Sequence, residues 1–302
     1  MNTRLAVLVL LVSSIGWGLT WLPLKGLNEM GLDGLQLILI AFASGSLLLL
    51  PMLIKQYVSW KNSIVLMLMI AFTGGVANAS FQTAMYHGDV IRVMILFYML
   101  PVWSVIGGRI FLKEKIDLIR IIAITLCLSG AYVILDIWNT SWKGVTWIDV
   151  LALTSGLGLA STNILFRFTQ NIPLLSKVNV MFLGCTFLIG VSIIFSTAPL
   201  TEMVPDESAI PLAILYGAVW LTLITIGTQW AVTRMEAGRS SIIIVMELVA
   251  AVVSVALITH ADLKTYEIIG GILVISAAIL EGSRADESNI KDDTNNIETK
   301  IA

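Results

Sequence analysis

Apolar stretches of helix length follow one another along nearly the whole chain, separated by short polar segments. A helix needs about 20 apolar residues to cross the hydrocarbon core of a bilayer, and each stretch is close to that length. The pattern predicts an all-α membrane protein with ten transmembrane helices and no soluble domain. The expected crossings lie near residues 5–25, 34–54, 63–86, 92–112, 118–136, 148–167, 176–196, 210–233, 239–259 and 266–282.

Composition agrees with this class. The chain is 57% hydrophobic and 13% charged, and its net charge is -2, a balance typical of a polytopic membrane protein. No basic cluster suited to nucleic acid is present, so the expected partners are the lipid bilayer and a small-molecule substrate. Oligomeric state is left open by the sequence.

Basic residues are divided unevenly between the two sides of the predicted bundle. With a cytoplasmic N-terminus, 14 of the 18 Lys and Arg residues fall on the inner side. Basic residues enrich cytoplasmic loops, so both chain ends are predicted to lie in the cytoplasm of a multi-pass inner-membrane protein. The basic segment 109–120 is interpreted as a topological anchor. The four outer residues are Lys25, Arg92, Lys143 and Lys264.

The chain repeats itself weakly. At an offset of 147 residues, Gln82 aligns with Gln229 and Arg92 with Arg239; earlier in each half, at an offset of 142, Lys25 aligns with Arg167. We predict two five-helix repeats, 1–138 and 144–282, and a disordered acidic cytoplasmic tail, 283–302. Because five is odd, the second repeat is inserted upside down, an arrangement common in secondary transporters with a binding site near the midplane.

Several segments resemble one family. Tyr98-Met99-Leu100-Pro101-Val102-Trp103, followed by Leu112-Lys113-Glu114-Lys115, resembles the fourth helix of EamA-type members of the drug/metabolite transporter superfamily. Gly16-Trp17-Gly18 resembles its first helix, Met246-Glu247-Leu248-Val249 its Glu-Pro-Val segment, and Gly270-Gly271 the start of its tenth helix. The resemblance covers about residues 5–282 in two copies and implies this fold and a transport activity.

The second copy departs from the first at two positions. Leu248 stands where Pro101 stands, and Ala261 where Glu114 stands. A bend is therefore expected in the fourth crossing, where Pro101 removes one backbone hydrogen bond, but not in the ninth. Family members include exporters of amino acids and other metabolites and sugar-phosphate or nucleotide-sugar carriers, so the resemblance does not name a substrate.

Polar side chains at membrane depth must face protein or water. Gly74, Asn78 and Gln82 share one face of the third crossing, and Thr222, Thr225 and Gln229 share one face of the eighth. We expect the two stripes to face each other across a polar cavity; the alternative is interhelical hydrogen bonding that holds the bundle together. Asn163, on the sixth crossing, joins the substrate-binding candidates.

Glu247 lies well inside the ninth crossing. A carboxylate there is costly unless it is paired or protonated, which suits proton coupling or binding of a substrate cation; the alternative is a helix–helix hydrogen bond. Protons are accordingly a candidate coupling ion.

Aromatic and basic side chains complete the candidate site. Trp17, Trp21, Tyr98 and Trp103 are expected to wall an apolar or cationic part of the substrate or, alternatively, to anchor at the interface. Lys25 and Arg167 end the first helix of each repeat. They either attract an anionic or zwitterionic substrate or snorkel to headgroups.

The favoured interpretation is a secondary exporter of amino acids or similar amphipathic compounds that works by alternating access. Import or promiscuous drug efflux by the same fold is an alternative. A membrane-embedded lipid-modifying enzyme is disfavoured because no cluster of His, Asp or Glu suited to acid–base or metal chemistry is seen. No metal site, cofactor or phosphate-binding Gly-rich loop is predicted.

Overall fold

The computed structural model describes residues 3–32, 34–139, 144–195, 206–260 and 262–284. Within these ranges the regular elements are helices, and nine helical stretches are long and apolar enough to cross a membrane. The shorter apolar helix α8, Leu118–Ile134, occupies the position predicted for the fifth crossing. The all-helical class is therefore confirmed, and the helices agree with the ten predicted crossings. The predicted tail is 283–302, and its residues beyond 284 lie outside the described part of the chain.

The first half of the chain contains five of the crossings. The first is α1 (Thr3–Gly18) with α2 (Trp21–Glu29), and the second is α3 (Gly34–Lys55). The short helices α4 (Tyr57–Trp60) and η1 (Lys61–Ser63) lead into α5 (Ile64–His87), the third crossing. The fourth is α6 (Val90–Phe97) with α7 (Leu100–Phe111), and α8 is the fifth.

The second half follows the same order after a turn, η2 (Ile137–Asn139). The sixth and seventh crossings are α9 (Trp147–Phe168) and α10 (Leu174–Phe195). The eighth is formed by α11 (Ala209–Leu215), the π-helical η3 (Tyr216–Leu221) and α12 (Thr222–Val232). The ninth is α13 (Ala237–Ile244) with α14 (Met246–Thr259), and the tenth is α15 (Thr265–Gly282).

Side-chain caps set several helix starts. Asp89 and Asp117 accept the backbone N–H of Arg92 and Arg120, each at 2.9 Å, and begin α6 and α8. Asp149 accepts the N–H of Thr146 at 2.6 Å and begins α9. Such caps satisfy donors that the first turn of a helix leaves free. These short polar sequences therefore end one crossing and start the next.

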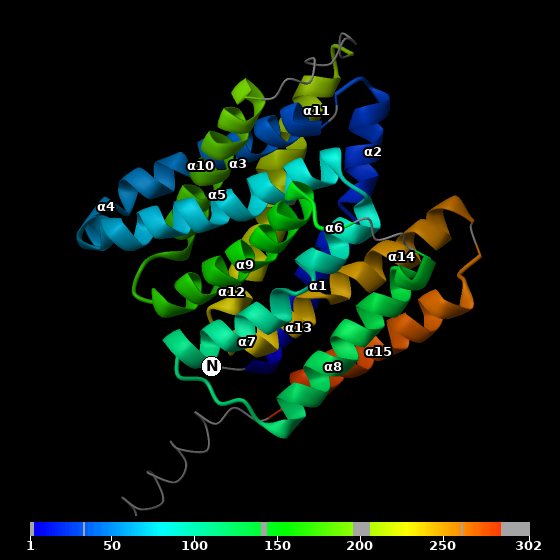
Figure 1. Ribbon diagram of the computed structural model, residues 1–302. Coiled ribbons are helices and arrows are strands. Elements are labelled where there is room, and N and C mark those ends of the chain that lie inside the picture. The colour runs from blue at the N-terminus through cyan, green and yellow to red at the C-terminus, as the bar shows by residue number, and fades with distance from the viewer. Residues whose placement is uncertain (1–2, 33, 140–143, 196–205, 261, 285–302) are drawn as a thin grey trace, which may run out of the picture.

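Two groups of helices lie at opposite sides of the molecule (Figure 1). One contains α3, α5 and α10 and is packed around Phe42 and Phe182, whose ring centroids are 5.3 Å apart. The other contains α8, α14 and α15, where Gly130 and Gly270 let α8 and α15 approach closely. Each group draws helices from both halves of the chain, so the halves interlock.

Both described ends of the helical region lie on the same side. Gly282, at the end of α15, faces Val7 of α1. Arg239 Nη2 also donates to the carbonyl oxygen of Gly282 at 2.7 Å. We call this side the terminal end, and the side that holds Lys25, Arg92 and Asp149 the opposite end.

Candidate functional site

Two transmembrane helices are interrupted at related positions. The fourth crossing breaks at Tyr98 and Met99, and the ninth at Val245. Pro101, in the first turn of α7, accounts for the first break because it lacks a backbone N–H. No proline stands at the second, so the sequence predicts no bend there. An alignment offset of 147 nevertheless pairs Tyr98 with Val245, and this repeat relation is the signal that would have located it.

The two breaks are joined by a hydrogen bond. The Tyr98 hydroxyl donates to Glu247 Oε1 at 3.2 Å. Tyr98 is fully buried among side chains of α8, α13 and α14, and Glu247 is partly buried. Both residues are candidates from the sequence, and the structure brings them together. Discontinuous helices of this kind are where transporters place substrate and ion sites.

The first crossing is interrupted too, at Leu19 and Thr20. On either side of this break, two candidate tryptophans donate to other helices. Trp17 Nε1 bonds Thr228 Oγ1 of α12 at 3.1 Å, and Trp21 Nε1 bonds Ser254 Oγ of α14 at 2.9 Å. These indoles therefore connect α1 and α2 to the second half of the chain. Both point towards other helices of the bundle.

A buried amide pair links α9 and α12. Gln229 Nε2 donates to Asn163 Oδ1 at 3.1 Å, and the two residues are 3% and 1% exposed. Within the described residues, the other amide atoms, Asn163 Nδ2 and Gln229 Oε1, have no protein partner, and neither do Thr225 Oγ1 and Trp103 Nε1. Buried polar atoms without partners are costly, so this cluster has hydrogen-bonding capacity that a substrate can use.

The polar face of α5 lies elsewhere. Asn78 Nδ2 donates to the carbonyl oxygen of Gly74 at 2.9 Å, and Cys185 of α10 approaches the same oxygen at 3.4 Å. Gln82 is partly buried farther along the same helix. Gln229 therefore finds its partner on α9, whereas Asn78 lies beside α10.

An ion network lies at the terminal end. Arg120, only 1% exposed, bonds Glu281 Oε1 through Nε at 3.2 Å and also pairs with Glu236. Arg284 contacts Glu281 at 3.1 Å and Asp117 at 2.5 Å. Arg120 belongs both to the basic segment 109–120, which was expected to be a topological anchor, and to the start of the predicted crossing 118–136. The structure buries it in the first turn of α8, where it joins α8 to α15 and to the turn before α13.

Beside this network, Glu114 joins three segments. Its carboxylate accepts the Ala237 N–H at 2.9 and 3.0 Å and pairs with Arg167 Nε at 3.0 Å. Burial raises the pKa of Glu114, and the Ala237 N–H and Arg167 act in the opposite direction. The loop after α7 is thus held against the end of α9 and the start of α13.

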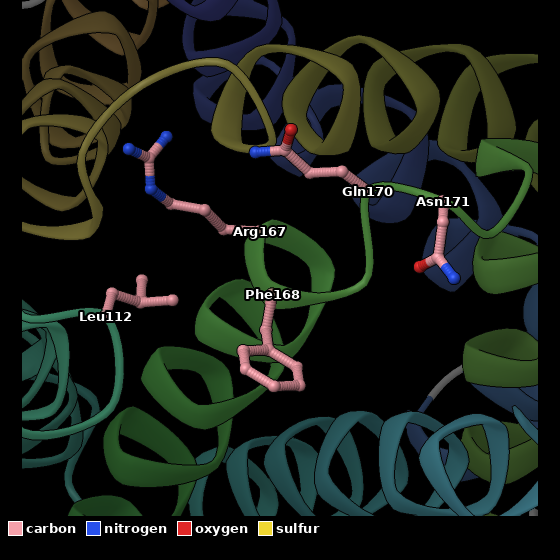
Figure 2. Close-up of a pocket in the computed structure, with 5 residues that line it drawn as sticks. All are labelled: Leu112, Arg167, Phe168, Gln170 and Asn171. Atoms are coloured by element: carbon pink, nitrogen blue, oxygen red, sulfur yellow. The ribbon is translucent and has the colours of Figure 1, made fainter. Parts of the chain in front are cut away.

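A pocket of about 480 Å³ opens next to Arg167. Its lining comes from the end of α9, the residues that follow it and the end of α7; Arg167 and Phe168 leave α9 in opposite directions (Figure 2). Gln170 Nε2 donates to the carbonyl oxygen of Thr233 at 3.2 Å and ties the pocket to the α12–α13 turn. The lining residues are Leu112, Arg167, Phe168, Gln170 and Asn171.

The opposite end has a smaller set of ion pairs among the described residues. Arg92 Nε pairs with Asp149 Oδ1 at 2.5 Å and connects α6 to α9. Lys25 and Glu29 form a 3.9 Å pair whose side chains are 60% and 68% exposed. The candidate cation Lys25 is thus a solvent-facing side chain, whereas its repeat equivalent Arg167 lines a pocket.

The comparisons with known proteins point to one family. Residues 4–136 match the sequence model of the EamA-like transporter family. A WAT1-related protein of Arabidopsis thaliana is 22% identical over 307 residues, covering 89% of this chain and 84% of that protein. These findings confirm the resemblance to EamA-type transporters, and they indicate a multi-pass membrane transporter of small solutes rather than an enzyme.

A protein of known crystal structure has the same fold. It superimposes with a TM-score of 0.70 over 91% of this chain and 95% of its own, at 13% sequence identity. At this identity the likeness shows the fold alone.

Proposed function

Because residues 4–136 belong to the EamA-like transporter family, we propose that the chain is a secondary transporter in which two inverted repeats, 1–138 and 144–282, provide alternating access. The packing supports this division. Helix α1 packs on α12 and α14, and its repeat equivalent α9 packs on α5, α6 and α7. The contacts of α8 with α15 and of α3 with α10 each join repeat-equivalent helices, and the repeat relates the contact of α5 with α10 to the contact of η3 with α3.

The proposed substrate site lies around the amide pair and the interrupted helices. Asn163, Gln229, Thr225 and Trp103 supply free donors and acceptors, and Tyr98 with Glu247 supplies a carboxyl at the two breaks. Trp17 and Trp21 border this region from α1 and α2. Asn78 and Gln82 of α5 are proposed as further substrate-binding residues, although Asn78 lies beside α10. Amides, aromatic rings and one carboxyl suit an amino acid or a similar amphipathic solute, which we propose is exported across the inner membrane.

The ion network supports a conformation closed at the terminal end. With both chain ends cytoplasmic, as the distribution of basic residues indicates, the closed side is the cytoplasmic one. Opening towards that side separates Arg120 from Glu236 and Glu281, and Arg167 from Glu114. The single observation that carries the proposed function is the meeting of two repeat-equivalent helix breaks through Tyr98 and Glu247.

Replacing Asn163 or Gln229 by alanine is expected to reduce transport about ten-fold, because loss of one hydrogen-bonding group costs about 1–2 kcal/mol. The measurement is counterflow of a panel of radiolabelled amino acids into proteoliposomes. Thr125→Ala is the matched control, since Thr125 is exposed and bonds only within α8 at 2.8 Å. Full transport by both amide variants, at unchanged protein yield, would remove the pair from the site.

Glu247→Gln is expected to abolish accumulation driven by a proton gradient while counterflow continues, because the amide mimics a permanently protonated carboxyl. Glu29→Gln, which alters an exposed carboxylate of the opposite end, is the control. Uptake by both variants would be followed with and without an imposed pH gradient. Gradient-driven accumulation that survives Glu247→Gln would show that this carboxyl does not couple transport to protons.

A growth assay in cells distinguishes export from import. A strain that overproduces an exporter should tolerate inhibitory amino acids or their analogues better than the parent strain, whereas an importer should sensitise it. Protection against unrelated toxic cations alone would favour drug efflux by the same fold.

A further inference from the structure

The pocket at the terminal end combines apolar and cationic chemistry. Leu112 and Phe168 provide apolar surface, and Phe168 is 59% exposed. Arg167, Gln170 and Asn171, which also line the pocket, provide hydrogen-bonding groups. A cavity of about 480 Å³ is in the size range of small-molecule sites. Its lining is complementary to a solute with one apolar and one anionic part.

The Arg167 guanidinium is only partly used by the protein. Its Nε pairs with Glu114 at 3.0 Å, and within the described residues its two terminal nitrogens have no hydrogen-bond partner. A guanidinium presents its N–H groups as a planar fork that matches the two oxygens of a carboxylate. Glu114 therefore fixes the orientation of Arg167 and leaves the outer fork available, which makes Glu114 a positioning residue.

The surroundings of the pocket carry excess positive charge. Lys177, 1% exposed, donates to the carbonyl oxygens of Phe166 and Thr169, each at 2.9 Å, on either side of Arg167 along the chain. Arg234 lies 4.0 Å from the Trp230 ring, next to the Thr233 carbonyl that accepts Gln170. Within the described residues neither cation forms a salt bridge, so an anion entering beside Arg167 meets a favourable field.

We propose that this pocket is a binding site for the carboxylate of an amphipathic solute, held by the outer fork of Arg167 with its apolar part against Leu112 and Phe168. The proposal rests on the transport function and adds a substrate class to it. Arg167 and Asn163 are one turn apart on α9, about 6 Å along the helix axis. A solute bound at Arg167 is thus one turn from the amide pair, at the mouth of the proposed path.

The site is tested by measuring how well small ligands protect an engineered thiol from labelling by a maleimide. In Asn171→Cys the new thiol lines the pocket, and both native cysteines are fully buried. Hexanoate is expected to slow maleimide labelling at least about ten-fold more potently than hexanamide, which has the same size and no charge. Equal potency of the two probes would overturn the proposal, and this comparison needs no Arg167 variant.

Variants then assign the effect to one side chain. Adding Arg167→Gln should abolish protection by hexanoate, and adding Arg167→Lys should weaken it. Lys61→Gln, the same charge change at an exposed lysine outside the candidate site, should leave it intact. Hexanoate protection that persists in a folded Arg167→Gln protein would show that Arg167 does not hold the carboxylate.

A lipid phosphate offers related anionic chemistry. Labelling in nanodiscs of phosphatidylglycerol and of phosphatidylcholine separates the two sources of an anion. Protection by phosphatidylglycerol without protection by hexanoate would replace the solute site with a headgroup site. Counterflow by the unmodified protein tests the transport function separately, so either idea can fail without the other.

Discussion

Arg120→Met is expected to lower the stability of the protein by about 3–5 kcal/mol, the usual cost of removing one partner from a buried ion pair. Arg120 bonds Glu281, which is 0% exposed, and pairs with Glu236. Without Arg120, and among the residues that the structure describes, the Glu281 carboxylate keeps only Arg284 as a partner, at 3.1 Å. The measurement is the thermal unfolding midpoint in detergent, together with the yield of monodisperse protein.

A second substitution tests the cause. Arg120→Met combined with Glu281→Met replaces the pair by apolar side chains, and it should recover part of the lost stability because no buried charge is left alone. Lys25→Met, which breaks an exposed pair, should have little effect. If Arg120→Met unfolds at the same temperature as the parent, the network contributes nothing measurable to the stability of the protein.

Gly184→Ala is expected to destabilise the bundle by about 1–3 kcal/mol or more, because an added methyl group has no space. A Cβ at Gly184 would collide with the backbone carbonyl of Ala71 on α5. A Cβ added at Gly75 of α5 would in turn collide with the Gly184 carbonyl. Backbone atoms cannot rotate away as side chains can. The methyl group would therefore force α5 and α10 apart along their whole contact.

Gly190→Ala is the matched control on the same helix. A Cβ there meets only Leu39 Cδ1 at 3.8 Å, an ordinary contact. Alanine favours a helix by about 1 kcal/mol over glycine, so this variant should be neutral or slightly more stable. The two proteins would be compared by thermal unfolding in one detergent, and equal midpoints would contradict the close packing of α5 on α10.

Several local features could be predicted because they depend on neighbouring residues alone. Apolar length located the crossings, since any helix in lipid must satisfy its backbone hydrogen bonds internally. The interruption of the fourth crossing follows from Pro101, whose missing N–H acts locally. Glu247 was identified as a candidate because a carboxyl inside an apolar helix is costly wherever it points. The structure supplied its partner, Tyr98, which lies 149 residues away in the chain.

Other features could not be predicted because they depend on which helices meet. The ninth crossing breaks at Val245 without a proline, and Asn163 pairs with Gln229 across two helices. Arg120 was interpreted as part of a topological anchor because its sequence neighbours are basic, yet it is buried against carboxylates more than 100 residues away. The sequence shows each of these groups, but not the distances between them.

By itself the sequence determined that this protein is an all-helical membrane protein with segments that resemble EamA-type transporters, because hydrophobic length and these segments are properties of contiguous residues. Only the tertiary structure decided which polar groups meet: Tyr98 with Glu247, Asn163 with Gln229, and Arg167 with Glu114. The physical reason is that helices pack in lipid through close contacts and interhelical hydrogen bonds. Such contacts depend on how each helix is rotated and which helices it faces, and hydropathy carries little information about either.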